Sequence, residues 1–282
     1  LARAIEALGY DQLDMFDHVV MGYPTETRKA PMYPPQMPII EALMTLSFIA
    51  SQTQTIGLGT EVLVLPQRNP TLTAKQVSTL STLSGGRVRL GVGVGWQQSE
   101  YEALGERFED RGKRMDESID ILRMYWGNER VDFDSQYYQI DAIAMEPKPP
   151  QGAALPIWIG GGAPAALRRV AERGDGWLAT SAMTDDQALA GMAEIRRMAE
   201  VAGRDPSAIG WQMMLDTPPR DEAGKRFYSD MDLVARAAER LSDLGFEWAA
   251  INATAIFQSG ARSMDAIEDV LGRIHNRISG VA

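Results

Sequence analysis

Residues 155–180 have the sequence LPIWIGGGAPAALRRVAERGDGWLAT, and this stretch decides the fold class. An apolar run at Leu155–Gly160 is followed by a helical pattern at 163–173 and by a second apolar run at Gly176–Thr180. Two short apolar runs separated by a helical pattern are typical of a βαβ unit, whose strands are parallel. The segment therefore predicts an α/β fold with a parallel sheet.

The same alternation extends along the rest of the chain. Further strand-like runs are Gln12–Phe16, Ile56–Leu65, Val88–Gly93, Ile209–Leu215 and Phe246–Ile251. Further helical patterns lie at 39–53, 70–83, 110–126, 185–202, 230–244 and 263–279. Each strand is followed by a helix, and a lone amphipathic helix that ends at Gly9 precedes the first strand. We expect a single (β/α)8 TIM-barrel domain over residues 1–282, with the first strand missing from this chain.

Two proline-containing stretches interrupt the rhythm. Residues 19–38 predict a long loop after the strand at Gln12–Phe16, and residues 127–154 predict a hairpin with a proline-rich return. In the hairpin we expect Val131 and Phe133 to face Tyr138 and Ile140. Both stretches would leave the C-terminal ends of barrel strands, where active sites lie, so both are candidate lids.

Composition narrows the class of partner. The 282 residues are 45% hydrophobic and 23% charged, which is typical of a globular protein, and the formal net charge is −10. That charge argues against nucleic acid or an anionic membrane as partner and favours a small-molecule substrate. The absence of cysteine excludes thiolate metal sites and a cysteine nucleophile. No apolar run is long enough to span a membrane, so we expect a cytoplasmic protein.

Few motifs point to a particular chemistry. No His-x-x-x-His, Gly-x-Ser-x-Gly or hydrolase-like carboxylate pair occurs, so no metal site or serine hydrolase is predicted. Of the two histidines, His275 lies in the last helical pattern beside arginines and predicts a surface residue. His18 closes a strand, where it either exchanges protons with a bound molecule or has a structural role.

Two glycine-rich segments follow strands. The sequence GVGVGW at 91–96 lets a backbone approach a flat ligand, and a polar stretch rather than a helix is expected after it. Gly161 and Gly162 join a strand to a helix that Pro164 opens, which favours a phosphate at the helix N-terminus over a turn without a ligand. Arg111 and Arg114 are either surface residues or further charges for the same anion.

Three long segments resemble a known family. They are ALGYDQLDMFDHVV at 7–20, TQTIGLGTEVLVLPQRNPTLTAKQVSTLSTLSGGRVRLGVGVGW at 53–96, and PIWIGGGAPAALRRVAERGDGWLAT at 156–180. The chain is similar to the luciferase-like monooxygenases, and within them to the deazaflavin (coenzyme F420)-dependent oxidoreductases. The resemblance implies a barrel that binds coenzyme F420 or FMN at its C-terminal mouth, in a protein that usually forms homodimers.

The resemblance also assigns roles to individual residues. Asp17 and His18 would border the cofactor ring, and Glu61 with Val62 matches a bulge behind it that often contains a non-proline cis peptide. Trp96 occupies the position of a glutamate proton donor in the family's sugar-phosphate dehydrogenases, so that acid and that substrate are not expected. The predicted catalytic residue is His18, and the predicted cofactor-binding residues are Asp17, Glu61, Val62, Gly93, Gly95, Trp96, Arg114, Gly161 and Gly162.

The leading functional hypothesis is hydride transfer between coenzyme F420 and a small organic substrate, with His18 handling a proton. The alternative is an FMN-dependent monooxygenase that uses O2 and flavin reduced by a partner reductase. Two other classes are a non-catalytic flavin-binding barrel and a phosphate-sugar lyase or isomerase. The last needs a catalytic acid or lysine at a strand end, for which Glu61 is the nearby candidate.

Overall fold

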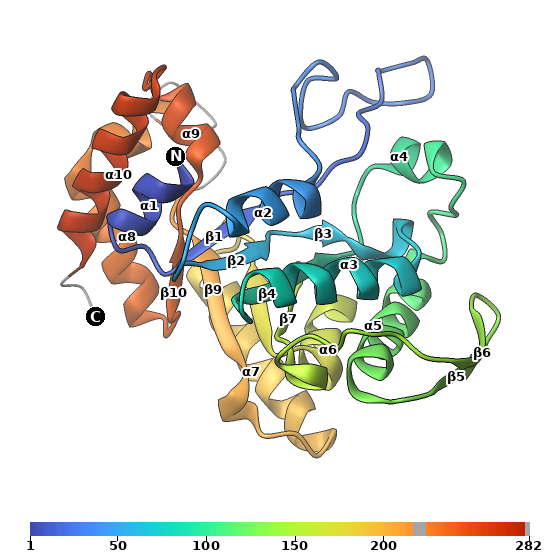
Figure 1. Ribbon diagram of the computed structural model, residues 1–282. Helices are drawn as coiled ribbons and strands as arrows, with labels where there is room; N and C mark the ends of the chain where they lie inside the picture. Colours follow the sequence, from blue (N-terminus) through green and yellow to red (C-terminus); the bar gives the residue numbers. More distant parts are fainter. Residues whose placement is uncertain (217–223, 280–282) are drawn as a thin grey trace. The chain divides into compact units, whose positions relative to one another are not determined.

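The computed structural model describes residues 1–216 and 224–279. The chain forms two compact units: the first unit is residues 14–157, and the second unit is residues 1–13 together with 158–282. Both units alternate parallel strands with helices (Figure 1). No helix in the described ranges is long and apolar enough to cross a membrane.

The strands of the first unit centre on β4 (Val88–Gly93), which is buried along its whole length. Strand β2 (Gly57–Thr60) pairs with the start of β4, and β3 (Leu63–Val64) pairs with its end, both in parallel. The single strand predicted at Ile56–Leu65 is therefore two strands, joined through a cis Glu61–Val62 peptide. The Glu61 amide donates to the carbonyl of Met15 at the end of β1 (Gln12–Met15), at 2.9 Å.

Four helices belong to the first unit: α2 (Ala42–Ala50), α3 (Pro70–Leu83), α4 (Gln98–Ala103) and α5 (Arg111–Gly127). Helix α3 contacts both α2 and α5. It begins at Pro70 because the Asn69 side chain accepts the Leu72 amide at 3.1 Å, as the cap and proline predict.

Helix α4 corrects the expectation that a polar stretch without a helix follows Gly95. Its sequence looks polar, but Tyr101 is completely buried, and the Tyr101 hydroxyl donates to the Val94 carbonyl at 2.8 Å. One buried aromatic ring thus fixes this short helix against the end of β4, and a single apolar residue gives no periodic signal in the sequence.

The two proline-containing stretches have the predicted secondary structure, one a long loop and the other a hairpin. Residues 16–41 contain neither helix nor strand. The hairpin consists of β5 (Val131–Asp134) and β6 (Gln139–Ile143), and Phe133 faces Ile140 as expected. Val131 faces Ile143 rather than Tyr138, because a register shift lies between Val131 and Phe133.

The second unit contains four parallel strands in chain order: β7 (Ile157–Gly160), β8 (Gly176–Ala179), β9 (Gly210–Met214) and β10 (Trp248–Ala250). Trp158 lies opposite Gly176, which in turn lies opposite Gly210. A Cβ atom on either glycine would overlap the Trp158 ring. The indole therefore occupies space that only glycine leaves free on the two neighbouring strands.

The helices of the second unit are α1 (Ala2–Ala7), α6 (Pro164–Arg173), α7 (Asp185–Val201), α8 (Met231–Asp243), α9 (Ala253–Gln258) and α10 (Met264–Ile278). Helix α1 contacts α10, and Gly9 follows α1 with a φ of 91°, as its predicted cap position requires. Helix α9 was not predicted. It begins where the Asn252 side chain accepts the Thr254 amide at 3.0 Å, and it is too short for a periodic pattern.

Candidate functional site

His18 forms a buried pair with a carboxylate that sequence reasoning missed. Its Nδ1 lies 3.1 Å from Oε2 of Glu100 on α4, and both residues are buried. The other Glu100 oxygen accepts the amides of Val19 and Val20. Because an ionised carboxylate only accepts hydrogen bonds, Nδ1 of neutral His18 carries the proton and Nε2 is left as an acceptor.

Aromatic rings surround the His18 imidazole. Trp96 meets it edge-on with the ring centroids 5.2 Å apart, and Tyr33 does so at 5.8 Å. Burial raises the pKa of Tyr33, so its hydroxyl stays protonated near neutral pH. Trp96 is 43% exposed whereas His18 is 7% exposed, so the indole covers one side of the histidine and faces solvent.

Asp17 precedes His18 but is tied to the protein by both oxygens. Oδ2 accepts the Val64 amide at 3.0 Å, and Oδ1 accepts from Nη2 of Arg68 at 2.8 Å. Arg68 also donates to Glu41 at 3.1 Å. These contacts make Asp17 the residue that fixes the end of β3 beside His18, and neither oxygen is left without a donor.

Residues that were predicted to lie around the cofactor ring contact one another in the first unit. A Cβ atom on Gly93 would lie 2.6 Å from Cγ2 of Val62, and one on Gly95 would lie 2.6 Å from Cγ1 of Val64. Gly95 also has a φ of 66°, which favours glycine. The two glycines thus make room for the valines of the neighbouring segment.

The two glycines of the Gly161–Gly162 turn differ in conformation and in hydrogen bonding. Gly161 has a φ of 116°, donates to the Leu178 carbonyl at 3.2 Å and accepts from the Trp177 indole at 2.7 Å. Within residues 1–216 and 224–279, the Gly162 and Ala163 amides have no hydrogen-bond acceptor. These two amides stand at the N-terminus of α6, where they and the helix dipole favour an anion.

Arg114 is a buried residue whose charge is already matched. It pairs with Glu106, and its Nε lies 3.5 Å from the Tyr138 hydroxyl. Burial opposes the Arg114 charge, but the hydrogen bonds to Glu106 and Tyr138 raise the pKa of the guanidinium. Arg111 lies over the Phe108 ring at 3.7 Å. The contacts of Arg111 and Arg114 are therefore with residues that precede α5 and with the β5–β6 hairpin.

A second buried carboxylate, also missed from the sequence, follows β9. Asp216 accepts from the Tyr228 hydroxyl at 2.6 Å, and that hydroxyl oxygen accepts the Asn252 amide at 3.0 Å. Burial raises the pKa of the Asp216 carboxyl, although the hydrogen bond from Tyr228 opposes the rise. An aspartate directly after an apolar strand was the available sequence signal.

We expect Asp216→Asn to raise the melting temperature at pH 7 by a few degrees. The folded-state pKa of Asp216 lies above its unfolded value, so the folded state holds the proton more tightly. The free energy of unfolding therefore falls as the pH rises from about 3.9 through the folded pKa. Asparagine stays neutral, and its oxygen still accepts from Tyr228.

Thermal melts between pH 4 and pH 8 test this expectation, with exposed Asp243→Asn as the control. The gain from Asp216→Asn should shrink as the pH is lowered, while Asp243→Asn stays near wild type throughout. A difference that does not change with pH would contradict the assigned cause.

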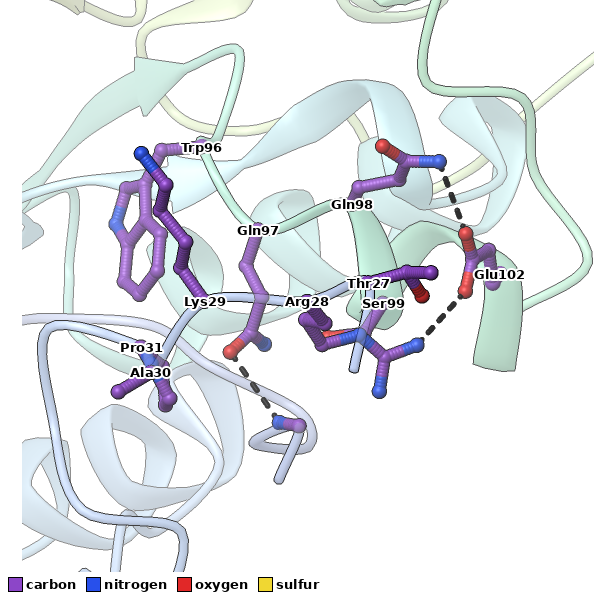
Figure 2. Close-up of a pocket in the computed structure, with 11 residues that line it drawn as sticks. Thr27, Arg28, Lys29, Ala30, Pro31, Trp96, Gln97, Gln98, Ser99 and Glu102 are labelled. Carbon is purple, nitrogen blue, oxygen red and sulfur yellow. Dashed lines mark hydrogen bonds and ion pairs between the residues drawn. The ribbon is translucent and has the colours of Figure 1, made fainter. Parts of the chain in front are cut away.

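A cavity of about 480 Å³ opens beside Trp96 (Figure 2). It lies between residues of the 16–41 loop and the start of α4, all in the first unit. Among the residues that the structure describes, no group of three or more His, Asp or Glu side chains is placed to hold a metal ion.

Comparisons with known proteins identify the family. The luciferase-like monooxygenase family model matches residues 1–223. A Mycobacterium tuberculosis protein without an assigned function is 36% identical over 212 residues, which cover 72% of each chain. The F420-dependent glucose-6-phosphate dehydrogenase of Nocardia farcinica is 31% identical over 216 residues, covering 72% of this chain and 63% of that protein.

Solved structures share the fold. An F420-dependent secondary alcohol dehydrogenase, in complex with an F420–acetone adduct, has a TM-score of 0.80 at 17% identity, covering 98% of this chain and 93% of that one. The oxygenating constituent of 3,6-diketocamphane monooxygenase from Pseudomonas putida, in complex with FMN, has a TM-score of 0.76 at 16% identity. The match covers 99% of this chain and 91% of that one. These likenesses confirm the predicted luciferase-like α/β fold. Together with the match over residues 1–223, they make this chain a member of the luciferase-like monooxygenase family.

Proposed function

We propose that this protein is an oxidoreductase that transfers a hydride between coenzyme F420 and a small organic substrate. The observation that carries the proposal is the His18–Glu100 pair at the end of β1, whose Nε2 is left to accept a proton. The F420-dependent dehydrogenases among the chain's relatives support the choice of cofactor.

Each of the two units has residues that suit one part of such a cofactor. The Gly162 and Ala163 amides suit its phosphate, because they lack other acceptors in the described ranges and stand at a helix N-terminus. Glu61, Val62 and Gly93 are the residues that we propose to back the ring. When bound, the deazaflavin supplies the hydride chemistry.

The chain's own contribution is proton handling and exclusion of water. Neutral His18 takes a proton at Nε2 when a substrate hydroxyl is oxidised, and returns it in the reverse direction. The Glu100 carboxylate holds the imidazole in the required tautomer and stabilises the positive charge that develops on it. Trp96 and Tyr33 limit the access of water to the ring.

The alternative is an FMN-dependent monooxygenase that receives reduced flavin from a reductase and uses O2. Trp96 favours this alternative, because an apolar ring stands where the related sugar-phosphate dehydrogenases carry an acid. Parallel titrations with coenzyme F420 and FMN separate the two proposals. Tighter binding of FMN would overturn the first. We further propose a homodimer, which sedimentation equilibrium of the full chain would test.

We expect Gly162→Val to weaken cofactor binding roughly tenfold or more, since two hydrogen bonds to a charged phosphate would be blocked. A Cβ atom at this position would overlap the terminal methyl of Met183, a flexible chain end, and would contact Thr180 at an ordinary distance, so the protein should still fold. Gly161→Val differs, because Gly161 has the positive φ, and that variant should lose stability instead.

Calorimetric titration of both cofactors into Gly162→Val measures the effect, and thermal melts check the fold. Gly162→Val combined with Met183→Ala is the control for a merely displaced methionine, and it should bind as weakly as the single variant. Wild-type affinity in Gly162→Val would place the phosphate elsewhere.

A further inference from the structure

The cavity beside Trp96 has the size of a small-molecule site. Its volume of about 480 Å³ falls within the usual range for ligand pockets, about 300–1,000 Å³. One wall is the loop segment from Thr27 to Pro31, and the other runs from Trp96 to Ser99. Figure 2 shows these two segments facing each other.

The walls of the cavity are held together by Gln97. Its Nε2 donates to the Val20 carbonyl at 2.7 Å, and its Oε1 accepts the Gly22 amide at 3.3 Å. Gln97 is itself buried. The loop is thus fastened to the start of α4, so the cavity is shaped before any ligand enters.

The charges that line the cavity do not cancel. Arg28 donates to Glu102 at 3.1 Å, and the second Glu102 oxygen accepts from Gln98 at 3.0 Å. Lys29 has neither an ion pair nor a hydrogen bond with any residue that the structure describes. One uncompensated positive charge therefore faces the cavity, in a chain whose formal net charge is −10.

The remaining features are an aromatic face and a hydroxyl. Trp96 is 43% exposed, and Figure 2 shows its indole at the same end of the cavity as the Lys29 side chain, away from the Arg28–Glu102 pair. The Ser99 Oγ is buried and has no partner in the part of the chain that the structure describes. Trp96 also meets the His18 ring edge-on, so the indole lies between the two features: it lines the cavity and contacts the histidine, whereas His18 itself does not line the cavity.

We propose that this cavity binds the organic substrate of the proposed reaction and selects a planar aromatic molecule that carries one carboxylate. The aromatic ring lies against Trp96, and the carboxylate pairs with the ammonium of Lys29. A single free cation matches a single negative charge, whereas a phosphate dianion calls for several donors. The choice of substrate class rests on the proposed function, but the binding site itself can be tested without turnover.

The probe is 2-naphthoate, titrated by calorimetry into the full chain. Its neutral analogue 2-naphthamide and the non-aromatic anion octanoate should both bind more weakly. Lys29→Met should lower the affinity for 2-naphthoate roughly tenfold, because a hydrogen bond to a charged group is lost. The affinity for 2-naphthamide should not change. Trp96→Leu should lower the affinity for 2-naphthoate but not the affinity for octanoate.

Lys113→Met is the matched control, since Lys113 is an exposed lysine on α5 outside the cavity. Equal binding of 2-naphthoate to Lys29→Met and Lys113→Met would overturn the proposal, as would preference for 2-naphthamide. If coenzyme F420 and FMN both fail to bind while 2-naphthoate binding depends on Lys29, the proposed function falls and the cavity assignment stands. If a cofactor binds but 2-naphthoate does not, the cavity assignment alone falls.

Discussion

Glu100→Gln is expected to reverse the tautomer of His18 and to lower turnover by about 10–100-fold. The Gln oxygen still accepts the Val19 amide, but its NH2 group replaces the oxygen that faces Nδ1 of His18. Nδ1 must then accept, so the proton moves to Nε2 and the imidazole no longer accepts a substrate proton there. His18→Ala should cost about 10²–10⁴-fold.

The tautomer can be measured without knowing the substrate. The chain has only two histidines, so the spectrum of protein labelled with ¹⁵N-histidine contains two imidazoles, and His275→Gln assigns them. Wild type should show His18 protonated at Nδ1, and Glu100→Gln should show it protonated at Nε2. The same tautomer in both proteins would contradict the assigned role of Glu100.

Turnover provides the second measurement, once an activity screen has supplied an acceptor. The exposed Glu109→Gln variant is the control and should retain wild-type turnover. Because His18 and Glu100 act as a pair, the double variant should be no slower than His18→Ala alone. If the turnover losses of the two single variants multiply in the double variant, Glu100 acts independently of His18.

The second large effect concerns Asp17, whose replacement by alanine should lower the free energy of unfolding by about 3–5 kcal/mol. The change leaves the Val64 amide without its acceptor and removes one of the two carboxylate partners of Arg68. The Asp17 side chain is completely buried, so water does not readily replace it. Urea denaturation followed by circular dichroism measures the loss.

Asp17→Asn separates the two contributions. Its oxygen keeps the bond to the Val64 amide, but the neutral side chain no longer balances the Arg68 charge, so an intermediate loss is expected. Combining Asp17→Asn with Arg68→Gln removes both charges and should recover part of the stability. If Asp17→Ala unfolds at the wild-type urea concentration, the carboxylate does not fix β3.

Local signals predicted most elements of the fold. Asn69 before Pro70 predicted the start of α3, and the Thr184 capping box lies where α7 begins. The apolar runs around the Gly161–Gly162 turn became β7 and β8 with α6 between them. Capping bonds and periodicity act over a few residues, so their signals are contained in the sequence itself.

The tertiary structure decided which side chains meet. Glu100 is 82 positions from His18, and Arg68 is 51 positions from Asp17, so no local pattern links either pair. The same holds for Lys29, whose lack of a partner among residues 1–216 and 224–279 depends on the path of a loop without regular structure.

The sequence by itself therefore determined the alternation of strands and helices, the family resemblance and the position of His18 at a strand end. The tertiary structure decided that Glu100 contacts His18, that both Asp17 oxygens are bonded to the protein, and that Lys29 faces the cavity without a partner among the described residues. The physical reason is that backbone propensity and capping act within a few residues, whereas ion pairs and cavities form between segments that only folding brings together.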